Sequence, residues 1–162
     1  MKTPNHPAGA AALPPEVLRF LRSARVAHLA TADGSGAPSV IPICFAIDPP
    51  RLYTPIDAKP KSLDARQLQR VRNLLANPRA AVVVDRWDED WSRIGWVLLR
   101  GRGEVLEPDP AAGSEYVRAL DLLREKYPQY REMALEGRPM IRLTVETHRA
   151  WGRLAEEEKR RP

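Results

Sequence analysis

The sequence predicts a mostly β domain with accessory helices, folded as a six-stranded antiparallel barrel. Three observations lead to this prediction. Short apolar runs follow one another through tight turns, beginning with the turn at 33–36. Helical patterns interrupt the strands at only two places within the series. The 162 residues are enough for about one domain. A barrel with a helix across its opening is the economical way to bury so many short apolar strands.

Each element has its own local signal. Pro14 and Pro15 mark the start of a first helix, because proline is tolerated in a first turn. Asn77-Pro78 marks the end of a second helix, and Gly101 and Gly103 mark a bulge in a long strand. Apolar alternation or continuous apolar runs predict strands over residues 26–32, 39–47, 52–56, 80–85, 96–107 and 140–145. Helical spacing of apolar residues predicts helices that begin near residues 14, 62, 114 and 129.

The segment 39–47 is apolar or small on both of its faces. Such a strand is covered on both sides, here by the barrel interior and by a helix or a second subunit. Pro42 cannot donate to a strand ladder, so we expect it at an edge, at a bulge or beside a ligand. The pattern therefore favours a homodimer.

Composition limits the classes of partner. The net charge of +5 and the pI near 9.7 fit nucleic acid, a phosphate-bearing cofactor or plain solubility. Aromatic residues make up only 6% of the chain, which disfavours a nucleic-acid binder that stacks bases on a sheet. No apolar run reaches the roughly 18 residues of a membrane span, and no His, Cys, Asp and Glu spacing indicates a metal site.

Three segments are expected along the chain: a flexible N-terminal stretch (1–13), a cofactor-binding domain (14–153) and a charged tail (154–162). The N-terminus has no apolar core of a secretory signal. The single cysteine, Cys44, excludes an internal disulfide, and we expect it to be a small buried hydrophobe. These features predict a cytoplasmic protein without a membrane partner.

Four segments in order carry a resemblance to a known family: LATADGSGAPSVIPICF, LYTPIDAKPK, RVRNLLANPRAAVVVD and DEDWSRIGWVLLRGRGEVLE. Together they resemble the split β-barrel flavoproteins related to pyridoxine-phosphate oxidase, and most of all the branch that uses the deazaflavin coenzyme F420. The resemblance covers nearly the whole chain, from Val17 to Gly152. It implies a homodimeric oxidoreductase that transfers hydride from reduced F420 to a small unsaturated or quinone-like molecule.

The resemblance also implies a set of cofactor-binding residues. Second-hairpin-strand positions would approach the ring, and cations after the third strand and in the following helix would hold the phosphate, with a tryptophan as a ring wall. In this sequence they are Ser39, Ile41, Pro42, Ile43, Lys59, Lys61, Arg70, Asn73 and Trp91. We assign no catalytic acid or base from the sequence, because the reduced cofactor would donate the hydride.

The sequence also allows other cofactors and other roles for the arginines. FMN is the alternative to F420 in the same fold, although the third strand lacks the mid-strand cation of FMN oxidases. A non-catalytic flavin- or haem-binding protein is a further alternative. The arginines of the second helix also fit the solvated side of an amphipathic helix.

Overall fold

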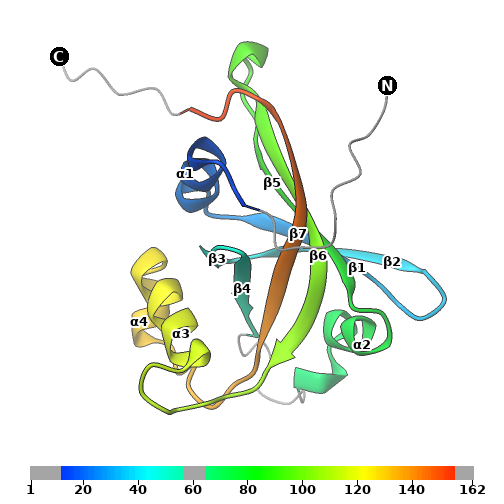
Figure 1. The fold of residues 1–162 in the computed structure, drawn as a ribbon, viewed down its shortest axis with the longest axis vertical. Coiled ribbons are helices and arrows are strands. Elements are labelled where there is room, and N and C mark those ends of the chain that lie inside the picture. The colour runs from blue at the N-terminus through cyan, green and yellow to red at the C-terminus, as the bar shows by residue number, and fades with distance from the viewer. Residues whose placement is uncertain (1–11, 57–64, 156–162) are drawn as a thin grey trace.

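The computed structural model describes residues 12–56 and 65–155, and in them seven strands form one antiparallel sheet (Figure 1). The order across the sheet is β2-β1-β5-β6-β7-β4-β3. The strands are β1 (Ala27–Ala32), β2 (Pro38–Ile43), β3 (Ala46–Asp48), β4 (Arg51–Pro55), β5 (Arg79–Arg86), β6 (Gly95–Leu106) and β7 (Met140–Gly152).

The predicted mostly β antiparallel fold with accessory helices is confirmed, but the six-stranded barrel differs from the structure in two respects. The expected strand at 39–47 is two strands, β2 and β3, and they occupy opposite edges of an open sheet. Only Cys44 and Phe45 separate them in sequence. The sheet therefore curls until its two edges approach each other at this joint.

The hydroxyl of Tyr127 explains why the strand breaks there. It accepts a hydrogen bond from the backbone N–H of Phe45 at 3.0 Å, and its proton is shared between the carbonyl oxygens of Arg25 (2.9 Å) and Phe45 (3.1 Å). With both of its backbone groups bonded to a side chain, Phe45 makes no strand ladder. This partner is 82 residues away, so the local sequence carries no sign of the break.

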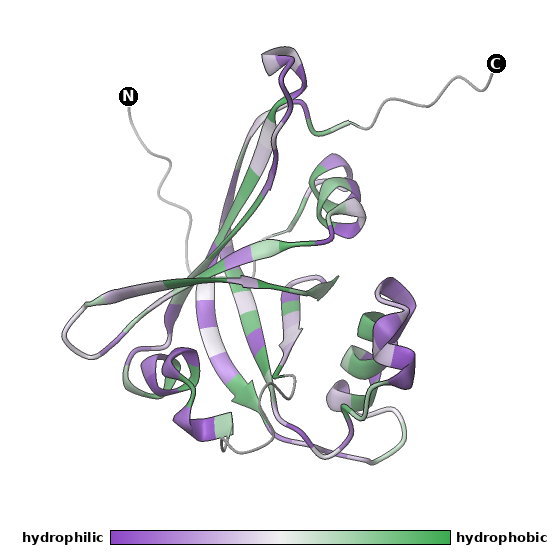
Figure 2. Cartoon of the chain, turned by 180° about the vertical axis from the view of Figure 1, so that it is seen from behind, coloured by the Kyte–Doolittle hydropathy of each residue, from purple (hydrophilic) through white to green (hydrophobic). Residues whose placement is uncertain are grey.

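The concave side of the sheet holds the main core. Alternate strand residues point inward, such as Val82, Val84, Val97 and Leu99, which is the period-two pattern of a half-buried strand. The same alternation of hydrophobic and hydrophilic residues is visible along the strands in Figure 2. Two helices join this core, α1 (Pro15–Ser23) and α2 (Gln69–Ala76), which follows the 3-10 turn η1 (Ala65–Gln67).

Helix α2 packs closely on β6 because Gly103 has no side chain. A Cβ at Gly103 would lie 2.6 Å from Cδ2 of Leu74 on α2. Asn73 of the same helix is buried and donates a hydrogen bond to the Thr31 hydroxyl of β1 at 3.0 Å. These contacts fix α2 against two strands at once.

The convex side carries a second apolar cluster. Helix α3 (Glu115–Lys126) buries Tyr116, Ala119, Leu120 and Leu123, and α4 (Gln129–Glu132) adds Tyr130. They pack against Ala46, Tyr53 and Met140 of β3, β4 and β7. The N-terminus of α3 is capped as its sequence suggests, since the Ser114 hydroxyl accepts from the N–H of Val117.

Two boundaries differ from the sequence prediction. β7 runs on past Val145 to Gly152, because its second half pairs with β6 through main-chain bonds and carries mostly exposed side chains. The predicted short helix at 129–136 ends at Glu132, where Met133 becomes extended. The bulge predicted from the glycines is confirmed between Arg100 and Gly101.

Candidate functional site

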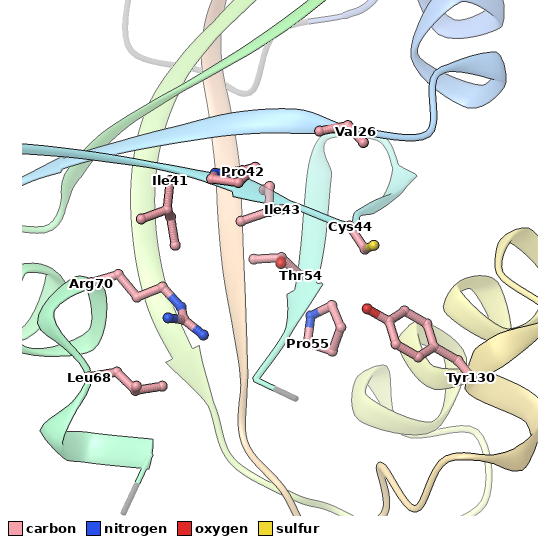
Figure 3. A pocket seen from close by; sticks show the side chains of 10 residues that line it. All are labelled: Val26, Ile41, Pro42, Ile43, Cys44, Thr54, Pro55, Leu68, Arg70 and Tyr130. Carbon is pink, nitrogen blue, oxygen red and sulfur yellow. The ribbon is translucent and has the colours of Figure 1, made fainter. Parts of the chain in front are cut away.

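A cavity of about 410 Å³ lies where the two edges of the sheet approach each other. β2 and β4 supply its walls, α2 borders one end and α4 the other (Figure 3). Its lining residues are Val26, Ile41, Pro42, Ile43, Cys44, Thr54, Pro55, Leu68, Arg70 and Tyr130. The cavity is thus built from segments of both the first and the last third of the chain.

One end of the cavity is cationic. Arg70 reaches from α2 toward the space beside Ile41, with Leu68 below it (Figure 3). Arg70 is the only charged residue among those lining the cavity in the described part of the chain. A guanidinium group in such a position suits a phosphate or carboxylate of a ligand, because it offers paired N–H donors in one plane.

The middle of the cavity presents one buried hydroxyl group. Thr54 on β4 is only 3% exposed, and its side chain has no hydrogen-bond partner among the described residues. Figure 3 shows its oxygen directed into the cavity. A hydroxyl group that faces a cavity without a protein partner can donate to or accept from an atom of a ligand.

The other end of the cavity carries a thiol and a phenol. Cys44 and Tyr130 lie there beside Pro55 (Figure 3). Cys44 is half-buried rather than buried, and it packs against the second apolar cluster as a small hydrophobic residue does.

Basic and aromatic residues lie behind this end. The Lys126 ammonium lies 3.7 Å from the ring centroid of Phe45 and donates to the Leu21 carbonyl at 3.1 Å. Burial lowers the pKa of Lys126 to about 8, and the positive charge of Arg25 lowers it further, while Cys44 opposes the shift. Burial by neighbouring side chains thus places a weakened base next to Cys44.

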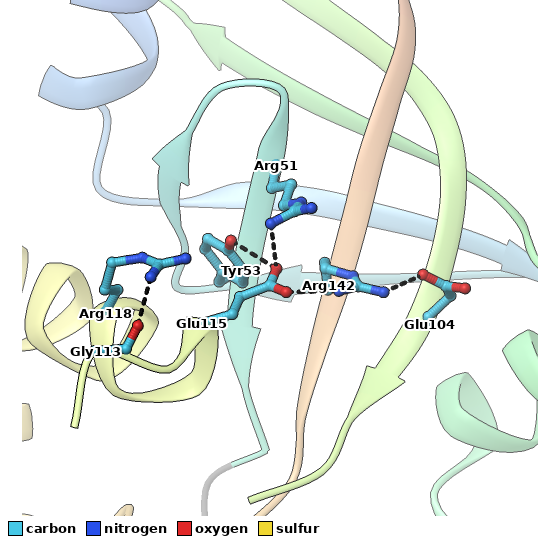
Figure 4. Close-up of polar contacts among 7 residues, drawn as sticks. All are labelled: Arg51, Tyr53, Glu104, Gly113, Glu115, Arg118 and Arg142. Atoms are coloured by element: carbon cyan, nitrogen blue, oxygen red, sulfur yellow. Dashed lines mark hydrogen bonds and ion pairs between the residues drawn. The ribbon is translucent and has the colours of Figure 1, made fainter. Parts of the chain in front are cut away.

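An ion-pair network fastens β4 to α3 on the convex side (Figure 4). The Glu115 carboxylate accepts from the Tyr53 hydroxyl at 2.9 Å and from Arg142 at 2.7 Å, and it pairs with Arg51 at 3.2 Å. Arg142 also pairs with Glu104 at 2.6 Å. Burial, and then the Glu115 carboxylate, raise the pKa of Tyr53 to about 12. The network holds the strand that presents Thr54.

Four of the nine residues expected at the cofactor line the cavity: Ile41, Pro42, Ile43 and Arg70. Ser39 lies two residues before Ile41 on β2, opposite Thr31, and is not part of the lining. Lys59 and Lys61 lie outside the described residues. Arg70 and the hydrophobic part of the expected site therefore come together around one space.

Asn73 and Trp91 lie elsewhere in the chain. Asn73 is buried between α2 and β1, where Thr31 and Gln69 occupy its amide. Trp91 begins the 3-10 turn η2 (Trp91–Arg93) at the tip of the β5–β6 hairpin, and it is 74% exposed. In Figure 1 this hairpin tip lies at the end of the molecule opposite to α2. Within one chain, neither residue lines the cavity.

Sequence reasoning missed Thr54, Cys44 and Tyr130 as lining residues. Thr54 has the composition of any β-strand residue, and its only local signal is its place just before Pro55 at the end of β4. Tyr130 enters from a helix more than 70 residues later, so no spacing rule connects it to the site.

The antiparallel sheet with its accessory helices agrees with the comparison with protein families. The chain belongs to the pyridoxamine 5'-phosphate oxidase family, whose model matches residues 13–152. A comparison with curated proteins gives no match.

Solved structures share the fold at low sequence identity. A conserved hypothetical protein from Mycobacterium tuberculosis, Rv2991, is 19% identical with a TM-score of 0.69, covering 93% of this chain and 90% of that one. The haem storage protein HutZ from Vibrio cholerae is 16% identical with a TM-score of 0.64, covering 88% and 95%. A haem-binding protein from Mycobacterium smegmatis is 18% identical with a TM-score of 0.65, covering 88% of this chain and 56% of that one.

The described residues contain neither a membrane-spanning helix nor a cluster of metal ligands. None of the described helices is long and apolar enough to cross a membrane. No group of three or more His, Cys, Asp or Glu side chains in residues 12–56 and 65–155 could hold a metal ion.

Proposed function

We propose that this protein is an oxidoreductase that binds coenzyme F420 and transfers hydride to a small unsaturated or quinone-like molecule. The observation that carries the proposal is the cavity itself. It combines an apolar wall from β2, one guanidinium group at one end and, between them, a hydroxyl group that faces the cavity. A planar heterocycle with carbonyl groups and an anionic tail matches that combination.

The residues present fit such a cofactor. Ile41 and Ile43 offer an apolar surface for a flat ring, Thr54 offers a donor to a ring carbonyl, and Arg70 offers a charge for the tail. The bound cofactor would supply the hydride. The chain binds and orients the ring and excludes water from it. FMN has the same general shape and stays an alternative.

The homodimer is part of the proposal. β2 turns Val40 and Pro42 away from the core, and Val40 is 62% exposed in the single chain. Exposed apolar strands of this kind are typical of protein interfaces. A second subunit covers this face, and the cofactor sites lie beside it.

A titration with F420 and with FMN, followed by fluorescence, tests the proposal. We expect tighter binding of F420, and we expect Arg70→Ala to weaken it by about 1–3 kcal/mol, the range for hydrogen bonds to charged groups. Arg72→Ala is the matched control, because Arg72 is exposed on the same helix, bonds Gln69 and does not line the cavity. Equal affinity of the two variants would place the tail elsewhere.

Ile41→Trp sharpens the assignment of the ring site. An indole at this position fills the cavity, so binding of either flavin-type cofactor should be lost while the circular dichroism spectrum stays unchanged. Leu75→Trp is the control, since Leu75 is 66% exposed on α2 and does not line this cavity. Unchanged affinity of Ile41→Trp contradicts the proposed ring position.

Haem binding without turnover is a second candidate, favoured by the haem proteins among the structures with this fold. The cavity offers two side chains that could ligate iron. Among the described residues that line it they are Cys44 and Tyr130, and the lining contains no histidine. A Soret band that appears on haem addition and disappears in Cys44→Ser would support haem binding at this site.

A further inference from the structure

Cys44 has no part in the proposed transfer of hydride. It is the only cysteine of the chain, and it follows β2 directly at the joint between the two sheet edges. Its sulfur lines the cavity at the end opposite to Arg70 (Figure 3). Any molecule that enters this end therefore meets a thiol.

An unpaired hydroxyl group faces the same cavity, independently of the thiol. Thr54 is 3% exposed as a residue, lines this space and has no side-chain hydrogen-bond partner among the described residues. A hydroxyl group in this position can donate to a carbonyl oxygen of a ligand. A ligand with such an oxygen would be held in the same cavity as the thiol.

The surroundings of Cys44 hold cations and no carboxylate in the cavity wall. The Lys126 ammonium lies over the ring of Phe45, the next residue, and the Arg25 guanidinium lies 4.9 Å from the ring centroid of Tyr127. No carboxylate lines the cavity in the described part of the chain. An enolate that forms in the cavity would therefore meet no negative side chain among the described lining residues.

We propose that Cys44 captures planar electron-poor alkenes, such as quinones and maleimides, by conjugate addition inside the cavity. The sulfur lone pair forms an S–C bond to the alkene carbon, and the π electrons of the C=C bond move to the conjugated carbonyl oxygen. The proton lost by the thiol ends on the resulting enolate. The adduct contains all atoms of both partners, and no oxidant or reductant takes part.

Thr54 and Cys44 have complementary parts in this reaction. A carbonyl that accepts a hydrogen bond from Thr54 is polarised, so its conjugated alkene carbon becomes more electrophilic. The walls from Ile41 and Ile43 favour a flat ring over a small flexible reagent. The inference rests on the thiol and the cavity alone, and it holds whether F420, FMN or neither binds.

The test uses the full chain without added cofactor and follows adducts by intact-protein mass. 1,4-Naphthoquinone is the planar probe, iodoacetamide is the small probe, and glutathione gives the rate of a free thiol with each. We expect the naphthoquinone-to-iodoacetamide rate ratio of Cys44 to exceed that of glutathione at least tenfold. We also expect the naphthoquinone rate to saturate with concentration, since the quinone binds before the bond forms. Cys44→Ser provides the background of lysine adducts.

Matched variants locate the reaction in the cavity. Ile41→Trp should lower the naphthoquinone rate at least fivefold with little change for iodoacetamide, whereas Leu75→Trp should leave both rates unchanged. A rate ratio equal to that of glutathione, with no saturation in the wild-type protein, would overturn the inference even if Ile41→Trp failed to fold. If the wild-type protein captures the quinone but does not bind F420, the proposed function is contradicted and this inference stands.

Discussion

The convex face of the sheet differs between its two halves. Over β3, β4 and the first half of β7, α3 and α4 cover it and bury Tyr53, Leu123 and Met140. Over β2, β1 and β5 it carries apolar side chains too, yet Val40 is 62% exposed. The two halves differ in what covers them. The covered half is stabilised within the chain, and the bare half leaves apolar side chains exposed in the single chain.

The largest expected effect lies in the covered half. Leu123 is fully buried, so Leu123→Ala should lower the free energy of unfolding by about 2–5 kcal/mol through lost burial and the cavity left behind. Urea denaturation at fixed protein concentration measures this. Leu75→Ala, at an exposed position on α2, should change stability by less than about 0.5 kcal/mol. Similar losses in both variants would show that α3 is not a core helix.

A substitution in the bare half should change the oligomeric state of the protein rather than its folding. Val40→Asp places a charge at the centre of the proposed dimer face, so the protein should become monomeric at micromolar concentration and keep its circular dichroism spectrum. Light scattering measures the mass. Leu75→Asp is the control, because Leu75 is exposed on α2 and not on the sheet, and it should leave the dimer intact. A monomeric wild-type protein would contradict the dimer itself.

A smaller effect should follow from the carboxylate that joins α3 to the sheet. Burial by itself would raise the pKa of the Glu115 carboxyl, but the Tyr53 hydrogen bond and the Arg142 charge outweigh burial and lower this pKa. Glu115→Gln should therefore cost about 1–3 kcal/mol of unfolding free energy at neutral pH.

The stabilisation that the Glu115 carboxylate contributes should decrease at low pH. Because the folded-state pKa of Glu115 is depressed, its stabilisation is complete above the ordinary value of 4.5 and is lost as the pH falls through the folded-state pKa. The difference in urea midpoint between wild type and Glu115→Gln should shrink from pH 7 to pH 3. A difference that stays constant over this range would show that the carboxylate charge contributes nothing.

Local patterns predicted most strands and helices, since alternation at Val82 and Val84 or the cap at Ser114 is written in neighbouring residues. Local patterns gave the wrong strand boundaries where a residue or strand far away in the sequence determines the structure. The break at Phe45 depends on Tyr127, and the second half of β7 depends on pairing with β6. A run of apolar residues at 39–47 reads as one strand because nothing in it reveals that its two halves belong to opposite sheet edges.

Some residues of the candidate site were predicted from the sequence, and others are revealed only by the structure. Ile41, Ile43 and Arg70 were expected, because they stand in segments that resemble a known family and come together across one cavity. Thr54 could not be expected, because only the three-dimensional structure shows that its hydroxyl is buried and without a partner. Asn73 looks like a ligand residue in sequence and serves in the structure as the link between α2 and Thr31.

The Tyr127 hydroxyl has a consequence for the order in which the chain can mature during synthesis. Residues 25 and 45 leave the ribosome early, and the side chain that holds their backbones together follows 82 residues after Phe45. A nascent chain can pair β1 with β2 as soon as both have emerged, but the joint that turns Cys44 toward the cavity waits for the end of α3. The cavity is thus completed only after residue 127 has emerged, so a ribosome-bound fragment that stops before residue 127 can carry the hairpin without the finished cavity.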